Sequence, residues 1–212
     1  MNSFKSSRPA GLKSIICFVF LLVLLGVSRY LPLDYPQLFN FTPVLAIFLI
    51  SGSYIKGYLG WFTPVLSVMI TDFALSQNYG QNLFEPFMLA TFLSYLLIFM
   101  LGRFMGSHRN LLTVATQGIL AALGFHLITC LFAWWANPAY AKTITGVIQA
   151  TIWGEPGYAP AYMFLRNSLL STVLFATALS IAANYFLNLK TTSTSQSIKP
   201  STASSTDSLK IT

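Results

Sequence analysis

Charged residues are scarce in this sequence of 212 residues. Only 8% are Asp, Glu, Lys or Arg, whereas 55% are hydrophobic and the mean hydropathy is +0.65. A soluble domain carries about 25% charged residues, because most of its surface faces water. The composition therefore indicates a protein whose surface mostly faces lipid. The length allows one helical domain and leaves no room for a separate soluble catalytic domain.

Motifs for common chemistry are also missing. The phosphate loop GxxxxGK(S/T) is absent, so the chain cannot energise transport by binding ATP in the usual way. Neither HExxH nor GxSxG occurs, and two histidines are too few for a multi-histidine metal site. Cys17 and Cys130 lie in apolar stretches without CxxC spacing. We expect no enzyme activity, no cofactor and no metal. An intramembrane enzyme is a third alternative, which no nucleophile–base pair supports.

The apolar residues fall into six segments that could each cross a membrane, which takes about 20 residues. We predict an all-α membrane domain over residues 14–189, with six transmembrane helices at about 14–31, 41–55, 58–76, 86–102, 111–135 and 161–189. Residues 1–13 are expected to be a cytoplasmic N-terminus, and the Ser- and Thr-rich segment 190–212 a disordered cytoplasmic tail. The first segment could instead be a cleaved signal peptide, but its retention is favoured.

The second and third segments are predicted to form a helical hairpin. A single helix over residues 41–75 would be about 52 Å long, too long for a hydrocarbon core of about 30 Å. Gly52, Gly57 and Gly60 supply turn residues in the middle. The sequence FTPVL occurs in both arms, and each copy is expected to place its proline, Pro43 or Pro64, in the first turn of a helix.

The basic residues predict the orientation of the domain. With the N-terminus inside, nine of the twelve Lys and Arg residues lie on the inner side. Arg29, Lys142 and Arg166 lie on the outer side. This positive-inside bias predicts that both termini are cytoplasmic. The basic residues are scattered in short runs, so the net charge of +7 does not indicate nucleic-acid binding.

A few polar residues lie near the outer ends of the predicted helices. Asp72 lies about one turn inside the outer end of the third helix, and Arg166 lies at similar depth in the sixth, followed by Asn167. A carboxylate at that depth usually faces a cavity or a partner. We therefore expect Asp72 and Arg166 to line an outward-facing polar pocket. The alternatives are a structural ion pair, or an Arg166 side chain that extends to the lipid headgroups.

Two further features have both a functional and a structural interpretation. His126 lies in the middle of the fifth helix, where it could relay protons or hydrogen-bond as a neutral ring to a neighbouring helix. The segment 30–40, which contains Pro32, is expected to be extended. Together with the aromatic connection 136–160, it could form a lid over a pocket, or both could be ordinary interfacial loops.

Two runs of residues carry a resemblance to known proteins: Arg29…Pro32…Asn40-Phe41-Thr42-Pro43 with Pro64…Thr71-Asp72, and Trp134…Tyr140…Lys142-Thr143…Gly146. The sequence resembles an uncharacterised family of small bacterial integral membrane proteins. That family looks like the substrate-binding S components of energy-coupling-factor vitamin transporters. The pattern departs at Cys130, where an Asn is expected, and at Arg166-Asn167, where an acidic residue is usual.

The resemblance implies a six-helix bundle in the bacterial inner membrane, with a ligand pocket that opens outward beneath the loop between the first two helices. It also implies docking onto a separate transmembrane coupling subunit and its ATPases. The candidate ligand-binding residues are Arg29, Asn40, Asp72, Glu85, His126, Trp134, Tyr140, Lys142, Arg166 and Asn167. The expected function is a substrate-binding or transport component for a small nutrient. The alternative is a membrane scaffold or assembly protein that does not transport.

Overall fold

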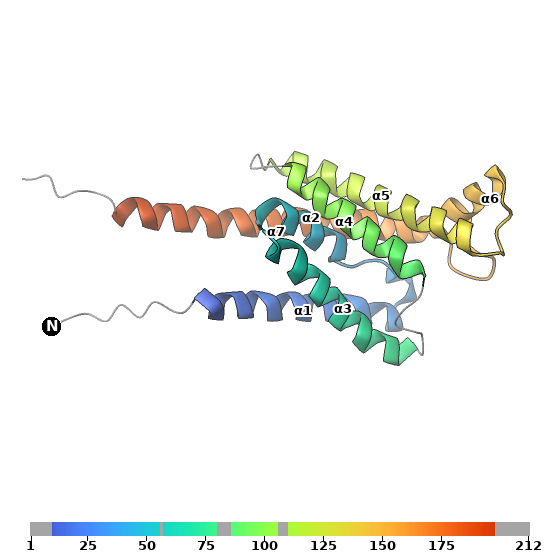
Figure 1. Ribbon diagram of the computed structural model, residues 1–212, viewed down its shortest axis with the longest axis horizontal. Helices are drawn as coiled ribbons and strands as arrows, with labels where there is room; N and C mark the ends of the chain where they lie inside the picture. Colours follow the sequence, from blue (N-terminus) through green and yellow to red (C-terminus); the bar gives the residue numbers. More distant parts are fainter. Residues whose placement is uncertain (1–9, 56, 80–85, 106–109, 198–212) are drawn as a thin grey trace, which may run out of the picture. The chain divides into compact units, whose positions relative to one another are not determined.

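A computed structural model describes residues 10–55, 57–79, 86–105 and 110–197 (Figure 1). These residues form seven α-helices: α1 (Ala10–Asp34), α2 (Val44–Tyr54), α3 (Leu59–Tyr79), α4 (Phe87–Met105), α5 (Leu111–Ala136), α6 (Ile144–Ile148) and α7 (Ala161–Ser197). A 3-10 turn, η1 (Pro36–Leu38), precedes α2, and a π-helical turn, η2 (Gln149–Trp153), follows α6. The chain divides into two compact units, Met1–Ser180 and Ile181–Thr212, and the site described below lies in the first.

Four helices are long and apolar enough to cross a membrane: Leu59–Ser76, Phe87–Phe104, Leu111–Ala136 and Ala161–Tyr185. They correspond to the predicted spans 58–76, 86–102, 111–135 and 161–189. The chain is thus an all-α, multi-pass membrane protein. The predicted span 41–55 contains only the 11 residues of α2, and the predicted span 14–31 lies in α1, where the side chains of residues 10–18 are outside the described part.

Helix α2 is the centre of the core. Every residue from Val44 to Gly52 is buried, and the helix packs against α3, α4 and α5. Two glycines allow the backbones of α2 and α4 to approach closely. A Cβ on Gly52 would overlap the Phe99 carbonyl, and one on Gly102 would overlap the Leu49 carbonyl. Because α2 is buried on all sides, it can be apolar all round without being long enough to span a membrane.

In the predicted hairpin, the expected position at the start of a helix is correct for one proline and wrong for the other. Pro43 is the residue before α2, where a proline has no intrahelical hydrogen bond to lose. Pro64 was predicted in the first turn of its helix, but it lies inside α3, which begins at Leu59. A proline there removes one hydrogen bond, and the rest of the helix forms on both sides of it.

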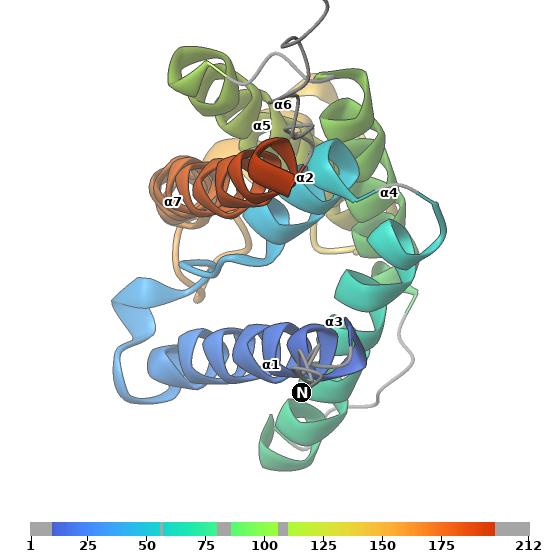
Figure 2. The same ribbon diagram turned by 90° about the vertical axis from the view of Figure 1, so that its left-hand side faces the viewer.

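The segment 30–40, predicted to be extended, is mostly helical. Helix α1 continues through Pro32 to Asp34, and the amide of Tyr35 donates to the Leu31 carbonyl at 2.9 Å. Pro32 removes only its own donor, so the hydrogen bonds on either side can continue the helix. Figures 1 and 2 show α1 next to α3, and the structure places these two helices in contact.

The connection 136–160 contains α6 and η2, which pack against each other and against α5. Thr143 caps α6 by accepting a hydrogen bond from the Gly146 amide. Helix α7 continues to Ser197, so residues 190–197 are helical although they were predicted to be disordered. They contain no Gly or Pro, and extending an existing helix is far easier than starting one. Residues 198–212 lie outside the described part.

Candidate functional site

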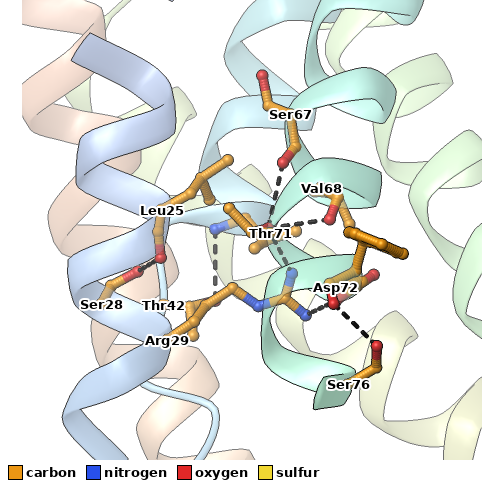
Figure 3. A network of polar contacts seen from close by, with 11 residues as sticks. Leu25, Ser28, Arg29, Thr42, Ser67, Val68, Thr71, Asp72 and Ser76 are labelled. Carbon is orange, nitrogen blue, oxygen red and sulfur yellow. Dashed lines mark hydrogen bonds and ion pairs between the residues drawn. The ribbon is translucent and has the colours of Figure 1, made fainter. Parts of the chain in front are cut away.

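An ion pair joins α1 to α3. The guanidinium of Arg29 lies with Nη2 2.5 Å from Asp72 Oδ1, and its Nη1 donates to Thr71 Oγ1 at 2.9 Å (Figure 3). The two charged side chains are 19% and 23% exposed. Thr71 also donates to carbonyls of its own helix, at Ser67 and Val68. Each charge therefore has a partner from another helix, as buried charges in membrane proteins usually do.

A cavity of about 610 Å³ lies beside this pair. Ligand pockets usually measure about 300–1,000 Å³, so its size is in the range for a small molecule. Arg29 lines the cavity, whereas Asp72 is not among its lining residues. Its walls are aromatic and aliphatic with a few polar groups: Arg29, Pro32, Phe39, Asn40, Thr42, Val44, Leu45, Leu75, Phe87, Tyr95, Phe125 and Ser168.

A smaller cavity of about 180 Å³ adjoins it. The two cavities share the wall residues Asn40, Phe87, Phe125 and Ser168. The smaller one adds three polar groups from α5 and a ring from α7: His126, Thr129, Cys130 and Phe164. Because the two cavities share these wall residues, His126 on α5 and Phe164 on α7 lie near the cavity that Arg29 lines.

Asn167 holds the loop between α1 and α2 against α7. Its Nδ2 donates to the carbonyl oxygens of Gln37 and Phe39 at 2.7 and 2.8 Å, and its side chain is 4% exposed. The same loop contributes Phe39 and Asn40 to the larger cavity. Asn40 has a positive φ of 63°, a conformation that Asn tolerates better than most residues. Asn167 thus fixes a strained segment of the cavity wall.

Two hydroxyl groups on buried residues of the wall have no hydrogen-bond partner within the described part of the chain. Tyr95, on α4, is 5% exposed and Ser168, on α7, is 3% exposed. Both line the larger cavity, and Ser168 also lines the smaller one. The fully buried side-chain atoms without a partner in the described residues are Gln117 Oε1 and Thr172 Oγ1, so the hydroxyl oxygens of Tyr95 and Ser168 are not fully buried. These two hydroxyls are therefore available to whatever occupies the cavity.

His126 is hydrogen-bonded to the π-helical turn. Its Nε2 lies 2.8 Å from the Thr151 carbonyl oxygen, and a carbonyl can only accept, so Nε2 carries a proton. Cys130 Sγ lies 3.7 Å from the ring nitrogens. This bond matches the structural interpretation of His126, a ring bonded to a neighbouring helix. The position of His126 in the wall of the smaller cavity leaves it open to a ligand as well.

Trp134, Tyr140 and Lys142 lie apart from the two cavities, at the corner between α5 and α6. Lys142 Nζ donates to the carbonyls of Trp134, Trp135 and Asn137, which are the free acceptors at the end of α5. The indole of Trp134 donates to the Ala141 carbonyl at 2.8 Å. Tyr140 is buried, and its burial, helped by the charge of Glu155, raises the pKa of its hydroxyl. None of the three lines either cavity.

Asp72 and Arg166 do not pair with each other. Asp72 is bound by Arg29, and the guanidinium of Arg166 donates to Asn167 Oδ1 at 3.2 Å. Of the candidate residues, the structure brings Arg29, Asn40 and His126 to the walls of the two cavities and places Asp72 behind Arg29. Glu85 lies outside the described residues.

The sequence-based candidates omitted several wall residues, above all Tyr95 and Ser168. A signal for Tyr95 was present, because it is the only tyrosine in the apolar run 86–102. Ser168 directly follows two residues that were selected, Arg166 and Asn167. Phe87 and Phe125 carry no such signal, because phenylalanine is common throughout the apolar segments.

No curated protein and no solved structure shows significant similarity to this chain. A family model matches residues 10–194, which is most of the chain and includes all the residues that line the two cavities. The chain belongs to the family of unknown function DUF6580.

Proposed function

We propose that this protein is the substrate-binding component of a transport system and captures a small nutrient in the cavity beside Arg29. The observation that carries the proposal is the cavity itself, which has a size suited to a small molecule and combines apolar walls with a few inward polar groups. The binding step needs no chemistry from the chain, so the proposed role is not enzymatic.

The short central helix supports the same proposal. At about 1.5 Å per residue, an 11-residue helix is only about 17 Å long, well short of a membrane core of about 30 Å. Residues 39–42, which come just before it, are not helical, and Phe39, Asn40 and Thr42 among them line the cavity. Non-helical backbone at membrane depth is tolerated where it lines a cavity, and short or broken helices often mark binding sites in transporters.

The proposed topology has six spans with both termini in the cytoplasm of a bacterial cell. In this arrangement 14–31 joins the four long helices, and α2 crosses together with the non-helical residues 39–43 before it, so that 41–55 belongs to the second crossing. The cavity opens to the outside. A reporter enzyme fused after Lys190 should then be active only in the cytoplasm. Because the chain has no phosphate loop, we propose that a separate membrane subunit and its ATPases supply the energy.

The test is a ligand screen on the purified full-length protein. A ligand that binds only the folded state raises the melting temperature, so a panel of vitamins, nucleobases and metal ions should contain at least one stabilising nutrient. Asn40→Ala, in the cavity wall, should weaken that effect, and Asn137→Ala, at the α5–α6 corner, should not. Cells lacking the chain should take up the same nutrient more slowly.

Two results would contradict the proposal. One is the absence of any stabilising ligand together with normal nutrient uptake in cells that lack the chain. The other is a stabilising ligand whose effect is the same in Asn40→Ala and in the unmodified protein. The first result would favour a scaffold or assembly role, in which the Arg29–Asp72 pair serves only to hold α1 against α3.

A further inference from the structure

The chemistry of the cavity wall restricts what the cavity can bind. The strongest restriction comes from the unpartnered hydroxyl groups of Tyr95 and Ser168, which are at least nine-tenths buried and belong to the same wall. Each hydroxyl can donate one hydrogen bond and accept others, and neither has a partner among the described residues. An occupant that accepts hydrogen bonds from both would supply those partners.

Arg29, another of the polar residues in the wall, is purely a donor. Arg29 uses Nη1 for Thr71 and Nη2 for Asp72, and guanidinium has five N–H donors and no acceptor. Arg29 therefore has further N–H donors, and it lines the cavity. A wall that offers two hydroxyls and a guanidinium favours a ligand rich in hydrogen-bond acceptors.

The electrostatic balance of the site favours a neutral ligand. Within the described residues, Arg29 is the single Lys, Arg, Asp or Glu in the walls of the two cavities, and its charge is already compensated by Asp72 at 2.5 Å. An anionic ligand would have to compete with Asp72 for the guanidinium and leave that carboxylate without its partner. A cationic ligand would meet no carboxylate in the wall. Moving an uncompensated charge out of water is costly in both cases.

The apolar part of the wall is suited to a ring. Four aromatic side chains, from Phe39, Phe87, Tyr95 and Phe125, line the larger cavity. The ring of Tyr95 is held between Phe48 and Phe125, with centroids 4.6 and 6.0 Å away and nearly parallel planes. This stack fixes the ring, so the position of its hydroxyl at the cavity is fixed too. Aromatic walls pack favourably against the face or edge of a planar ring.

We propose that the cavity binds a neutral aromatic ring compound with a carbonyl or ring nitrogen that accepts hydrogen bonds from Tyr95 and Ser168. This inference rests on the proposed function and narrows it to one chemical class. Arg29 adds a donor to the same acceptor group, and Asp72 is a positioning residue that holds the guanidinium in place from behind.

The experiment uses three bicyclic probes that differ only in charge: a quinoline carboxamide, the carboxylate at the same ring position, and the matching aminomethyl compound, which is a cation at neutral pH. Binding to the purified full-length protein is measured by thermal stabilisation over a range of concentrations. The neutral amide should bind with a Kd at least about tenfold lower than either ion, which is the factor expected for about 1.4 kcal/mol.

Four variants assign the contacts. Tyr95→Phe and Ser168→Ala each remove one hydroxyl and keep the packing, and each should weaken amide binding about fivefold to tenfold. Tyr140→Phe and Ser67→Ala are matched controls, because both residues are buried and line neither cavity. The controls should bind the amide as tightly as the unmodified protein.

Each other outcome overturns a defined part of the inference. Tighter binding of the carboxylate or the cation would refute the neutral class and leave the proposed function standing. Amide binding that is unchanged in Tyr95→Phe and Ser168→Ala would refute the two hydroxyl contacts. If none of the probes binds at millimolar concentration, the inference of a neutral ring ligand is wrong, whereas the proposed function is decided by the nutrient screen and the uptake measurement.

Discussion

Arg29 and Lys142 are both basic residues that the sequence suggested for ligand binding, and the structure uses them in different ways. Lys142 donates to three carbonyls at the end of α5, all within eight residues of it in the chain. Arg29 is held by Thr71 and Asp72, more than 40 residues away on another helix, and lines a large cavity. In the corner region, the α5–α6 connection around Lys142, the polar groups are hydrogen-bonded to nearby residues. In the cavity region, the walls of the two cavities, the hydroxyls of Tyr95 and Ser168 have no partner among the described residues and can bind an occupant.

The largest effect is expected at the ion pair of the cavity region. Asp72→Ala leaves the Arg29 guanidinium partly buried without its counter-charge, which should lower the free energy of unfolding by about 3 kcal/mol. Chemical or thermal unfolding of the purified protein measures this free energy. The double variant Arg29→Met, Asp72→Leu should be more stable than the single variant, because it leaves no unpaired charge. Equal losses in both variants would contradict the account.

Asn167→Ala should have the next largest effect. It removes two partly buried hydrogen bonds to carbonyls of the α1–α2 loop, so the free energy of unfolding should fall by about 2 kcal/mol. Since that loop lines the cavity, the quinoline carboxamide should also bind more weakly. Asn137→Ala, in the corner region, is the control, and it should lower stability without changing the binding. A variant of Asn167 with normal probe binding would show that the loop is fixed by other contacts.

Lys142→Met tests the other side of the comparison. The substitution keeps most of the apolar stem and removes the cation that caps α5, which should cost about 1 kcal/mol of stability. Binding of the probe should not change, because Lys142 lines neither cavity. Thermal unfolding with and without the probe gives both quantities. Loss of binding with little loss of stability would place Lys142 in the site and remove the distinction between the two regions.

The smallest effect is a pH dependence in the corner region. Burial, together with the charge of Glu155, raises the pKa of the Tyr140 hydroxyl in the folded protein. As the pH rises past the ordinary value of about 10, the unfolded chain loses this proton first, so stability falls. Tyr140→Phe should show a shallower decline of the free energy of unfolding above that pH. Identical slopes in the two proteins would show that the Tyr140 hydroxyl titrates normally.

Hydropathy and helix breakers were sufficient to predict four of the spans. The segments 86–102 and 111–135 agree with α4 and α5 within a few residues, because each is a long apolar run between polar residues. The failures occur where a local rule is overridden. Pro64 lies within α3 because the energy lost with one hydrogen bond is smaller than the packing gained by the longer helix. The aromatic residues of 136–160 did not reveal α6, which is only five residues long.

The candidate site was harder to predict, because it depends on contacts between distant segments. Asp72 was correctly selected as an unusual carboxylate in an apolar helix, but its partner is Arg29 and not Arg166. Arg166 was placed beside Asp72 because the two residues lie at similar depth in the membrane, but similar depth does not show which helices are neighbours. Tyr95 and Ser168 become notable only when the structure shows two buried residues whose hydroxyls have no partner in the described residues beside a cavity.

The most direct test of the account is the accessibility of the cavity wall from outside the cell. In a chain with Cys17→Ser and Cys130→Ala, Ser168→Cys supplies one thiol in the walls of both cavities. A charged thiol reagent that does not cross membranes should label this thiol in intact cells, and the quinoline carboxamide should slow the labelling. A thiol that reacts only after the membrane has been permeabilised, or that reacts equally fast with the probe present, would contradict an outward-facing ligand site.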